Sequence, residues 1–273
     1  MFDLQDTFLK SPTRMKTRML HALPGIPRTT FAKLFSLAGL LALAVVCVGS
    51  VYAQQRLSKR YPASRNVHIE LKNISGTIKV ESWNRDEIKL TADLESSKDN
   101  VSPRQSKDQL VIDVMSDNRG RADVGDINFT LYVPVASSVD LQTKRGNISV
   151  NNIRGEMVSA HVTLEGDIEL TRINAAKVNA QNTIGDVFFD GEFASGGIYR
   201  FQSGKGAINI RIPADSAFNL EASANNKQIT IGPFWNSGFR SMGDGRKYVG
   251  DVIDGRSKVI VTSFQGSITF IRR

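Results

Sequence analysis

The sequence has few of the residues from which disulfides, metal sites and acid–base sites are usually built. Its 273 residues include one cysteine and three histidines. A lone cysteine forms no intramolecular disulfide and excludes the CxxC pairs of structural zinc and thiol redox sites. The isolated histidines His68 and His161 are interpreted as strand or surface residues rather than as a catalytic or two-histidine metal site. We therefore expect no metal, no cofactor and no enzymatic activity.

The main part of the chain also lacks an excess of positive charge. The net charge is +8, but residues 1–53 hold six cations and two anions, so half of the excess precedes residue 54. The remaining 220 residues are nearly balanced. This asymmetry is typical of a membrane-targeting start and not of a DNA-binding face. We expect no nucleic-acid partner.

Only one long hydrophobic run is present, the twenty uncharged residues from Leu34 to Ala53. A helix of this length spans a bilayer at about 1.5 Å per residue. Small residues before Gln54 also fit a signal-peptidase site, and a start at Met15 or Met19 would give a conventional signal peptide. The run is therefore expected to be either a retained anchor, which would make the membrane a partner, or a cleaved signal peptide. Both alternatives place the following residues outside the cytoplasm.

These features give a domain plan. Cys47 follows Val46 inside the apolar run, where a lipoprotein site needs a small residue, so it is interpreted as a buried, inert thiol. The plan comprises a basic cytoplasmic or signal n-region over 1–33, the hydrophobic helix over 34–53, a linker over 54–64 and a folded domain over 65–273.

The folded domain repeats one phrase about every 20 residues. In each copy a glycine follows a Ser, Thr or Asn by three positions and precedes two apolar residues, at the second and fourth positions after it. The copies centre on Gly76, Gly146, Gly166, Gly185, Gly206 and Gly266. The steps from Gly146 to Gly206 are 20, 19 and 21 residues. A further copy has Lys227 in place of the glycine, and the last step, of 39 residues, is about twice the unit.

Each part of the phrase has a physical reason. Glycine reaches positive φ at little cost and suits a tight corner, and the hydroxyl or amide side chain can hydrogen-bond the turn backbone. Alternating apolar residues on both sides predict strands with one buried face. Stacked units would form one interior column from Ile148, Ile168, Val187, Ile208, Ile229 and Ile268. We expect an all-β fold, a β-solenoid of strand–glycine turn–strand repeats preceded by the hydrophobic helix.

A β-sandwich or barrel is the competing architecture, because short strands with frequent turns describe it too. The region from Val67 to Val133 lacks the glycine phrase and is expected to cap the stack. Its predicted strands cover 67–71, 87–94, 109–115 and 127–133.

The tandem x-G-x-I-x-V phrase, Ile212-Pro213 ahead of Phe218 and the closing run 254–270 resemble the DUF4097 family, whose members are often labelled adhesins. The resemblance covers about residues 65–272. It implies a β-helical extracytoplasmic domain of bacterial envelope proteins and supplies no catalytic residues. The sequence departs from the pattern at Lys227 and in the long stretch 232–257.

Two candidate sites follow from the repeats. Asp167 and Asp186 occupy one repeat position, so in-register coils would place them about 4.8 Å apart, as in a paired-acid or calcium site. Asp, Asn and Ser are equally ordinary turn residues after a glycine, and we prefer this interpretation.

The second candidate is a set of aromatic and cationic residues in the stretch 232–257, which could bind a ligand or fold back as a plug. Its members are Phe234, Trp235, Phe239, Arg240 and Tyr248.

The expected function is that of a non-catalytic, adhesin-like binding or scaffold protein of the cell envelope, tethered by or processed from its hydrophobic segment. Its expected partner is an envelope polymer or protein. The alternative is a carbohydrate-active β-helix enzyme that uses Asp167 and Asp186.

Overall fold

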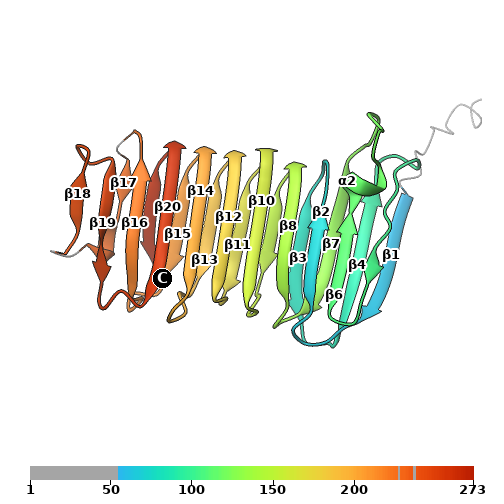
Figure 1. The fold of residues 1–273 in the computed structure, drawn as a ribbon, viewed down its shortest axis with the longest axis horizontal. Coiled ribbons are helices and arrows are strands. Elements are labelled where there is room, and N and C mark those ends of the chain that lie inside the picture. The colour runs from blue at the N-terminus through green and yellow to red at the C-terminus, as the bar shows by residue number, and fades with distance from the viewer. Residues whose placement is uncertain (1–54, 227, 236–237) are drawn as a thin grey trace, which may run out of the picture. The chain divides into compact units, whose positions relative to one another are not determined.

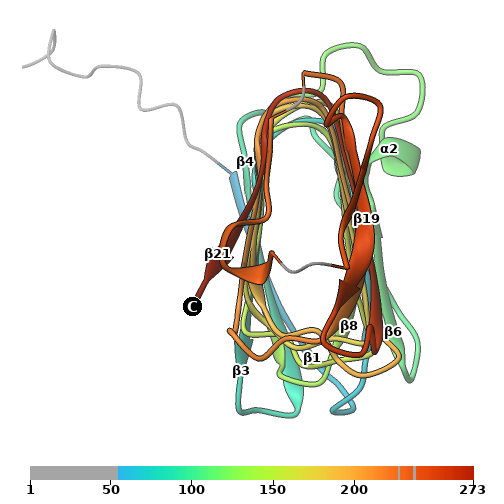
Figure 2. The same ribbon diagram turned by 90° about the vertical axis from the view of Figure 1, so that its left-hand side faces the viewer.

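The computed structural model describes residues 55–226, 228–235 and 238–273, and within them the fold is nearly all β. Two large sheets lie on opposite sides of a shared interior (Figures 1 and 2). The described helices are the short α2 (Val114–Asp117) and the 3-10 turn η1 (Gly232–Phe234). The expected all-β class is confirmed.

Sheet A has ten strands. Their spatial order is β1 (Gln55–Pro62), β4 (Glu87–Leu94), β7 (Ile127–Pro134), β3 (Ile78–Trp83), β9 (Ile148–Asn151), β11 (Ile168–Ile173), β13 (Val187–Gly191), β15 (Ile208–Ile212), β21 (Ile268–Arg272) and β17 (Ile229–Thr230).

Sheet B has eleven strands. Their spatial order is β18 (Arg240–Met242), β19 (Lys247–Val252), β16 (Phe218–Ala224), β20 (Ser257–Gln265), β14 (Ile198–Lys205), β12 (Lys177–Ile184), β10 (Met157–Glu165), β8 (Ser138–Arg145), β2 (His68–Lys72), β6 (Gln109–Asp113) and β5 (Arg104–Gln105).

Through the repeats the chain runs along a strand of sheet B, turns at the glycine corner, runs along a strand of sheet A and returns. We call one such circuit a coil. Successive coils pair in parallel and in register, so that Ile148 lies beside Ile168, Ile168 beside Val187 and Val187 beside Ile208. These side chains are at most 1% exposed. The predicted interior column is confirmed for these four members.

The predicted order of the last two residues of the column, Ile229 and Ile268, is wrong. Ile268 pairs with Ile208 on one side and with Ile229 on the other, so the final coil lies between its two predecessors. The same insertion occurs in sheet B, where β20 pairs with both β14 and β16. The double-length step explains the insertion. The chain leaves β17, forms the antiparallel strands β18 and β19 outside β16, and then returns to fill the gap.

The region before the regular repeats closes the other end of the stack. Its four predicted strands are present as β2, β4, β6 and β7. The first coil, formed by β2 and β3, lies between β6 and β7 on one side and β8 and β9 on the other. The expected linker over 54–64 is not a plain linker, because residues 55–62 form β1, which pairs with β4 along its whole length. Leu57 and Tyr61 of this strand pack against the core.

The glycine corners stack directly on one another. A Cβ added to Gly166 would collide with the carbonyl of Gly146, and one added to Gly206 would collide with that of Gly185. Gly146 also has a φ of 106°. The corner therefore requires glycine for two reasons, a positive φ and the close approach of the neighbouring coil's backbone.

Buried polar side chains line the interior of the same corners. Ser203 Oγ donates to the Gly185 carbonyl at 3.0 Å, and Ser263 Oγ donates to the Gly206 carbonyl at 3.2 Å. Thr143 Oγ1 donates to the carbonyl of Arg145 at 2.9 Å. The prediction that the residue three positions before the glycine hydrogen-bonds the turn backbone is confirmed for Thr143, whereas Ser203 and Ser263 bond the corner of the neighbouring coil.

The expected hydrophobic helix over 34–53 lies outside the described residues. Within the described part of the chain, no helix has the length and hydropathy needed to cross a membrane.

Candidate functional site

Asp167 and Asp186 lie on neighbouring coils, as their shared repeat position predicts, but their carboxylates bind the backbone. Asp167 Oδ1 accepts a hydrogen bond from the amide of Asp186 at 2.8 Å, and Asp186 Oδ1 accepts one from the amide of Ala207 at 2.7 Å. Asn147 Oδ1 makes the same bond to the amide of Asp167 at 2.9 Å. Because an asparagine fills this role equally well, the position needs an oxygen acceptor and not a negative charge.

No group of three or more His, Cys, Asp or Glu side chains among the described residues is arranged to hold a metal ion. His68 lies on β2 and His161 on β10, two strands away in sheet B. They do not share a site, because β8 lies between them.

The predicted aromatic set divides into a buried and an exposed part. Phe234 is 4% exposed, and its ring centroid lies 5.8 Å from that of Phe218 and 6.4 Å from that of Phe270. It closes the interior at the end of the stack, so its inclusion among ligand-binding residues is wrong. The plug interpretation holds for this residue.

In the rest of the set Phe239 is 8% exposed and also belongs to the core, Tyr248 packs against the core, and Trp235 and Arg240 are exposed. Trp235 is 57% exposed, stacks on Phe239 at 5.6 Å and meets Tyr248 edge-on at 6.0 Å. Arg240 is exposed on β18, opposite Val249 of β19. The structure thus brings Trp235, Phe239 and Tyr248 together, with Arg240 on the adjacent edge strand.

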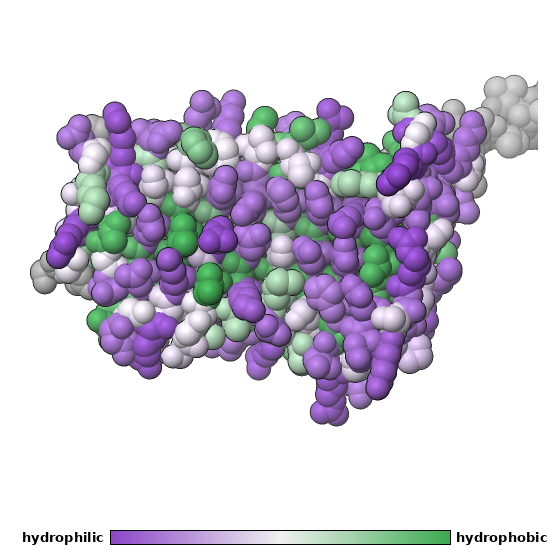
Figure 3. All heavy atoms as spheres, in the orientation of Figure 1, coloured by the Kyte–Doolittle hydropathy of each residue, from purple (hydrophilic) through white to green (hydrophobic). Residues whose placement is uncertain are grey.

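The outer face of sheet B carries a column of polar side chains. The column consists of Gln142, His161, Gln181, Gln202 and Thr262, which pair in register across five strands. In Figure 3 hydrophilic residues predominate on the face in view, and hydrophobic ones form small separate groups. Hydrogen-bonding groups therefore repeat along this face at the strand spacing of about 4.8 Å.

A pocket of about 280 Å³ lies where the central strands of sheet A end, and we call it the arginine pocket. Its charged lining residues are Arg154, Arg172, Glu192 and Arg273, and Asn174 also lines it. Sequence reasoning missed it. The arginines occupy different positions relative to their glycines, at eight residues after Gly146 and six after Gly166, so they form no column in the repeat.

Ion pairs connect the pocket to the adjoining strands. Glu192 Oε1 pairs with Arg273 Nη2 at 3.1 Å, and Glu192 Oε2 accepts a hydrogen bond from Asn174 Nδ2 at 3.1 Å. The buried Asp190 pairs with Arg211 Nη2 at 2.6 Å and with Arg273 Nη1 at 3.5 Å. The hydrogen bond from Arg211 to Asp190 raises the pKa of the arginine.

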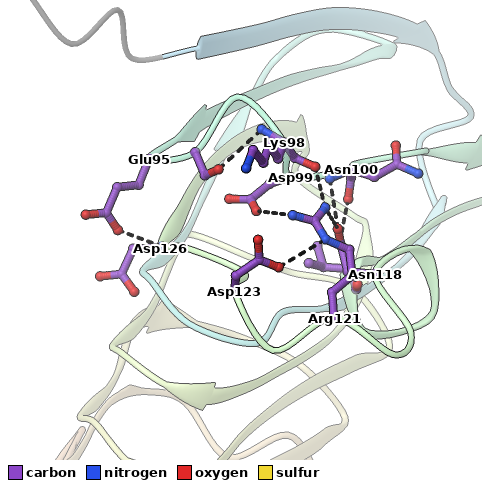
Figure 4. A network of polar contacts seen from close by, with 10 residues as sticks. Glu95, Lys98, Asp99, Asn100, Asn118, Arg121, Asp123 and Asp126 are labelled. Atoms are coloured by element: carbon purple, nitrogen blue, oxygen red, sulfur yellow. Dashed lines mark hydrogen bonds and ion pairs between the residues drawn. The ribbon is translucent and has the colours of Figure 1, made fainter.

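A second charged cluster lies in the loops at the other end of the stack (Figure 4). Arg121 pairs with Asp99 at 3.8 Å and with Asp123 at 3.4 Å, and its Nη1 donates to the carbonyl of Lys98. Asn118 Nδ2 donates to the carbonyl of Asn100 at 2.8 Å. These contacts join the loop after β4 to the loop after α2, so the cluster stabilises the end of the stack.

The fold and its sites define an all-β protein of two sheets with repeated glycine corners, a flat polar face and a cationic pocket. The sequence matches the Toastrack DUF4097 family over residues 66–222, more than half of its length, and the chain belongs to that family. The resemblance inferred from the repeats is confirmed. No curated protein matches the chain.

Several solved structures are similar to this one. A candidate cell adhesion protein from Clostridium sporogenes shares 12% sequence identity at a TM-score of 0.46, with 81% of this chain and 100% of that chain covered. A candidate adhesin from Bacteroides fragilis shares 10% identity at a TM-score of 0.35, with 81% and 99% covered. A candidate adhesin from Parabacteroides distasonis shares 9% identity at a TM-score of 0.30, with 81% and 98% covered.

Proposed function

We propose that this protein is a non-catalytic, adhesin-like binding or scaffold protein of the cell envelope, built on a β-solenoid. The in-register parallel pairing of coils supports the solenoid, because each coil buries its apolar face only against its neighbours. Such a stack presents long, regular outer surfaces, which suit contact with a polymer or with another protein.

The observation that carries the non-catalytic proposal is the hydrogen bonding of Asp167 and Asp186. A glycosidase needs one carboxyl group to protonate the leaving group and a second to act on the sugar or on water. Here each of the two carboxylates accepts a backbone amide of the next coil, and asparagine takes the same role at 147. The enzyme alternative would require these bonds to be replaced by substrate, so we favour a structural role.

The location outside the cytoplasm is proposed from the sequence. The uncharged run from Leu34 to Ala53 follows a segment with six cations and two anions, the arrangement of a signal peptide or an N-in anchor. Whether that segment is cleaved decides between a secreted and a tethered protein.

Fractionation of cells, with determination of the mature N-terminus, tests the location. We expect the protein outside the cytoplasm, either starting at Gln54 or intact in the membrane fraction, and a cytosolic protein with an intact leader would refute the proposal. Cosedimentation of the purified full-length chain with envelope fragments tests the binding role. Saturable binding is expected, and its absence would refute that role.

The enzyme alternative has its own test. The D167N/D186N variant keeps both oxygen acceptors and removes both negative charges, so we expect unchanged binding to envelope fragments. Release of reducing sugar from glycans by the wild type, lost in a folded D167N/D186N variant, would establish the enzyme instead.

A further inference from the structure

The acidic residue that lines the arginine pocket does not neutralise all of the positive charge of its arginines. Both oxygens of Glu192 are occupied, one by Arg273 and the other by the amide of Asn174. No hydrogen bond or ion pair joins the side chain of Arg154 to any other described residue. Arg172 has only the neutral oxygen of Asn151 as its side-chain partner. Two guanidinium groups therefore remain without a counter-ion around one cavity.

The guanidinium of Arg172 is held in place before any ligand arrives. Its Nε and Nη2 donate to Asn151 Oδ1 at 2.9 and 2.7 Å, which leaves three of its five N–H groups available. Its backbone has a φ of 54°, and Asn152 on the neighbouring coil has a φ of 58°. Left-handed conformations are uncommon outside glycine and recur at ligand-binding sites. A fixed arginine loses little freedom when it binds an anion.

A second cavity of about 440 Å³ adjoins the arginine pocket at Glu192, which lines both. Its polar lining residues also include Ser195, Asp215, Ser216 and Arg256. Hydroxyl and carboxylate groups can hydrogen-bond the hydroxyls of a neutral sugar. Glu192 and Asp215 outnumber Arg256, which is itself paired with Asp254, so this part is unfavourable for a ligand charged at every unit, such as polyphosphate.

We infer that the two cavities together bind an acidic glycan of the envelope, with the carboxylate of one uronic acid between Arg154 and Arg172 and a neutral sugar in the adjoining cavity. This inference rests on the proposed binding function and names its ligand class. Arginine recognises carboxylates through paired, charge-assisted hydrogen bonds. Loss of one such contact weakens binding by about tenfold or more.

The test measures binding of a xylotetraose that carries one glucuronic acid to the purified full-length chain by titration calorimetry. We expect saturable binding, and binding at least about tenfold weaker for unsubstituted xylotetraose and for the R154Q/R172N variant. Asparagine at 172 tolerates the left-handed backbone. The matched control is R200Q/K258Q, which removes two exposed positive charges from the outer face of sheet B. The control should bind the acidic oligosaccharide as the wild type does.

Three results would overturn the inference: equal binding of the acidic and neutral oligosaccharides, equal weakening in the R200Q/K258Q control, or tighter, pocket-dependent binding of tripolyphosphate. R154Q alone provides a second variant, because this exposed side chain has no described partner whose loss could unfold the protein. Wild type that binds envelope fragments but not the acidic oligosaccharide would refute the pocket and leave the proposed function intact. Wild type that binds neither would refute both.

Discussion

Replacement of Gly185 by alanine tests the stacking of the corners most directly. The new Cβ would collide with the backbone carbonyl of Gly166 and lie 2.9 Å from Asp167 Oδ1. Gly185 also has a φ of 131°, which alanine adopts only with strain. Because the obstacle is backbone, relief requires two coils to move apart. Backbone strain and overpacking each cost about 1–3 kcal/mol, so we predict a loss of about 2–6 kcal/mol in the free energy of unfolding.

Gly196 provides the matched control. Its φ is 75°, and apart from its two chain neighbours no described residue has an atom within 4 Å of the position that its Cβ would occupy. Alanine there is strained by the backbone angle alone, at a cost of about 1–2 kcal/mol. Both substitutions change the unfolded chain in the same way, so their difference isolates the contact between coils.

Equilibrium urea unfolding, followed by circular dichroism, measures both variants. A typical domain has 5–15 kcal/mol of stability, so G185A should remain foldable but show a much lower midpoint than G196A. If G185A were no less stable than G196A, the close approach of the glycine corners would not exist in solution.

Three further predictions concern the described side chains. D167A/D186A should lose about 0.5–1.5 kcal/mol of stability for each of the two hydrogen bonds removed, whereas D167N/D186N should melt near the wild type, as thermal unfolding would reveal. Phe234→Ala should destabilise by about 3–5 kcal/mol because its ring is buried, and Trp235→Ala by less than about 1 kcal/mol because its side chain is exposed; equal effects would contradict the plug. The hydrogen bond from Lys247 lowers the pKa of Glu221 in the folded protein below its ordinary value of 4.5. The ionised Glu221 therefore stabilises the fold fully above pH 4.5, and this stabilisation is lost as the pH falls through the lowered pKa. E221Q should therefore reduce the acid dependence of stability measured by urea unfolding at a series of pH values, and an unchanged dependence would contradict the pair.

The structure of the regular repeats could be predicted from the sequence because each repeat contains its own strand and turn residues. Alternation around Gly146, Gly166 and Gly185 predicted the strands, the corners and the interior column, and Thr143 and Asn182 predicted hydrogen bonds at the corners. Four strands of the first region, β2, β4, β6 and β7, were also predicted, whereas β1 was expected to be part of a linker. These features depend on residues within one unit, and neighbouring units of similar length fall into register automatically.

The candidate sites were less predictable. The aromatic residues of 234–248 look alike in sequence, but Phe234 lies inside the stack and Trp235 outside it, because only the path of the closing turn decides which ring is buried. The arginine pocket draws Arg154, Arg172 and Arg273 from distant parts of the sequence at unequal repeat positions. No local pattern marks a site of this kind.

By itself, the sequence determined that the chain is all β, that it turns at glycines about every 20 residues and that Ile148, Ile168, Val187 and Ile208 are buried together. Tertiary structure alone decided the order of the coils. The last coil enters between two earlier ones because β14 and β16 each offer a parallel edge to β20, although β20 follows both along the chain. It also decided the use of Asp167 and Asp186, since their acceptor role depends on the amide that the next coil presents. The conformational preferences of residues act within one repeat unit. The order of the coils and the hydrogen-bond partners of polar side chains instead depend on contacts between coils that are distant in sequence.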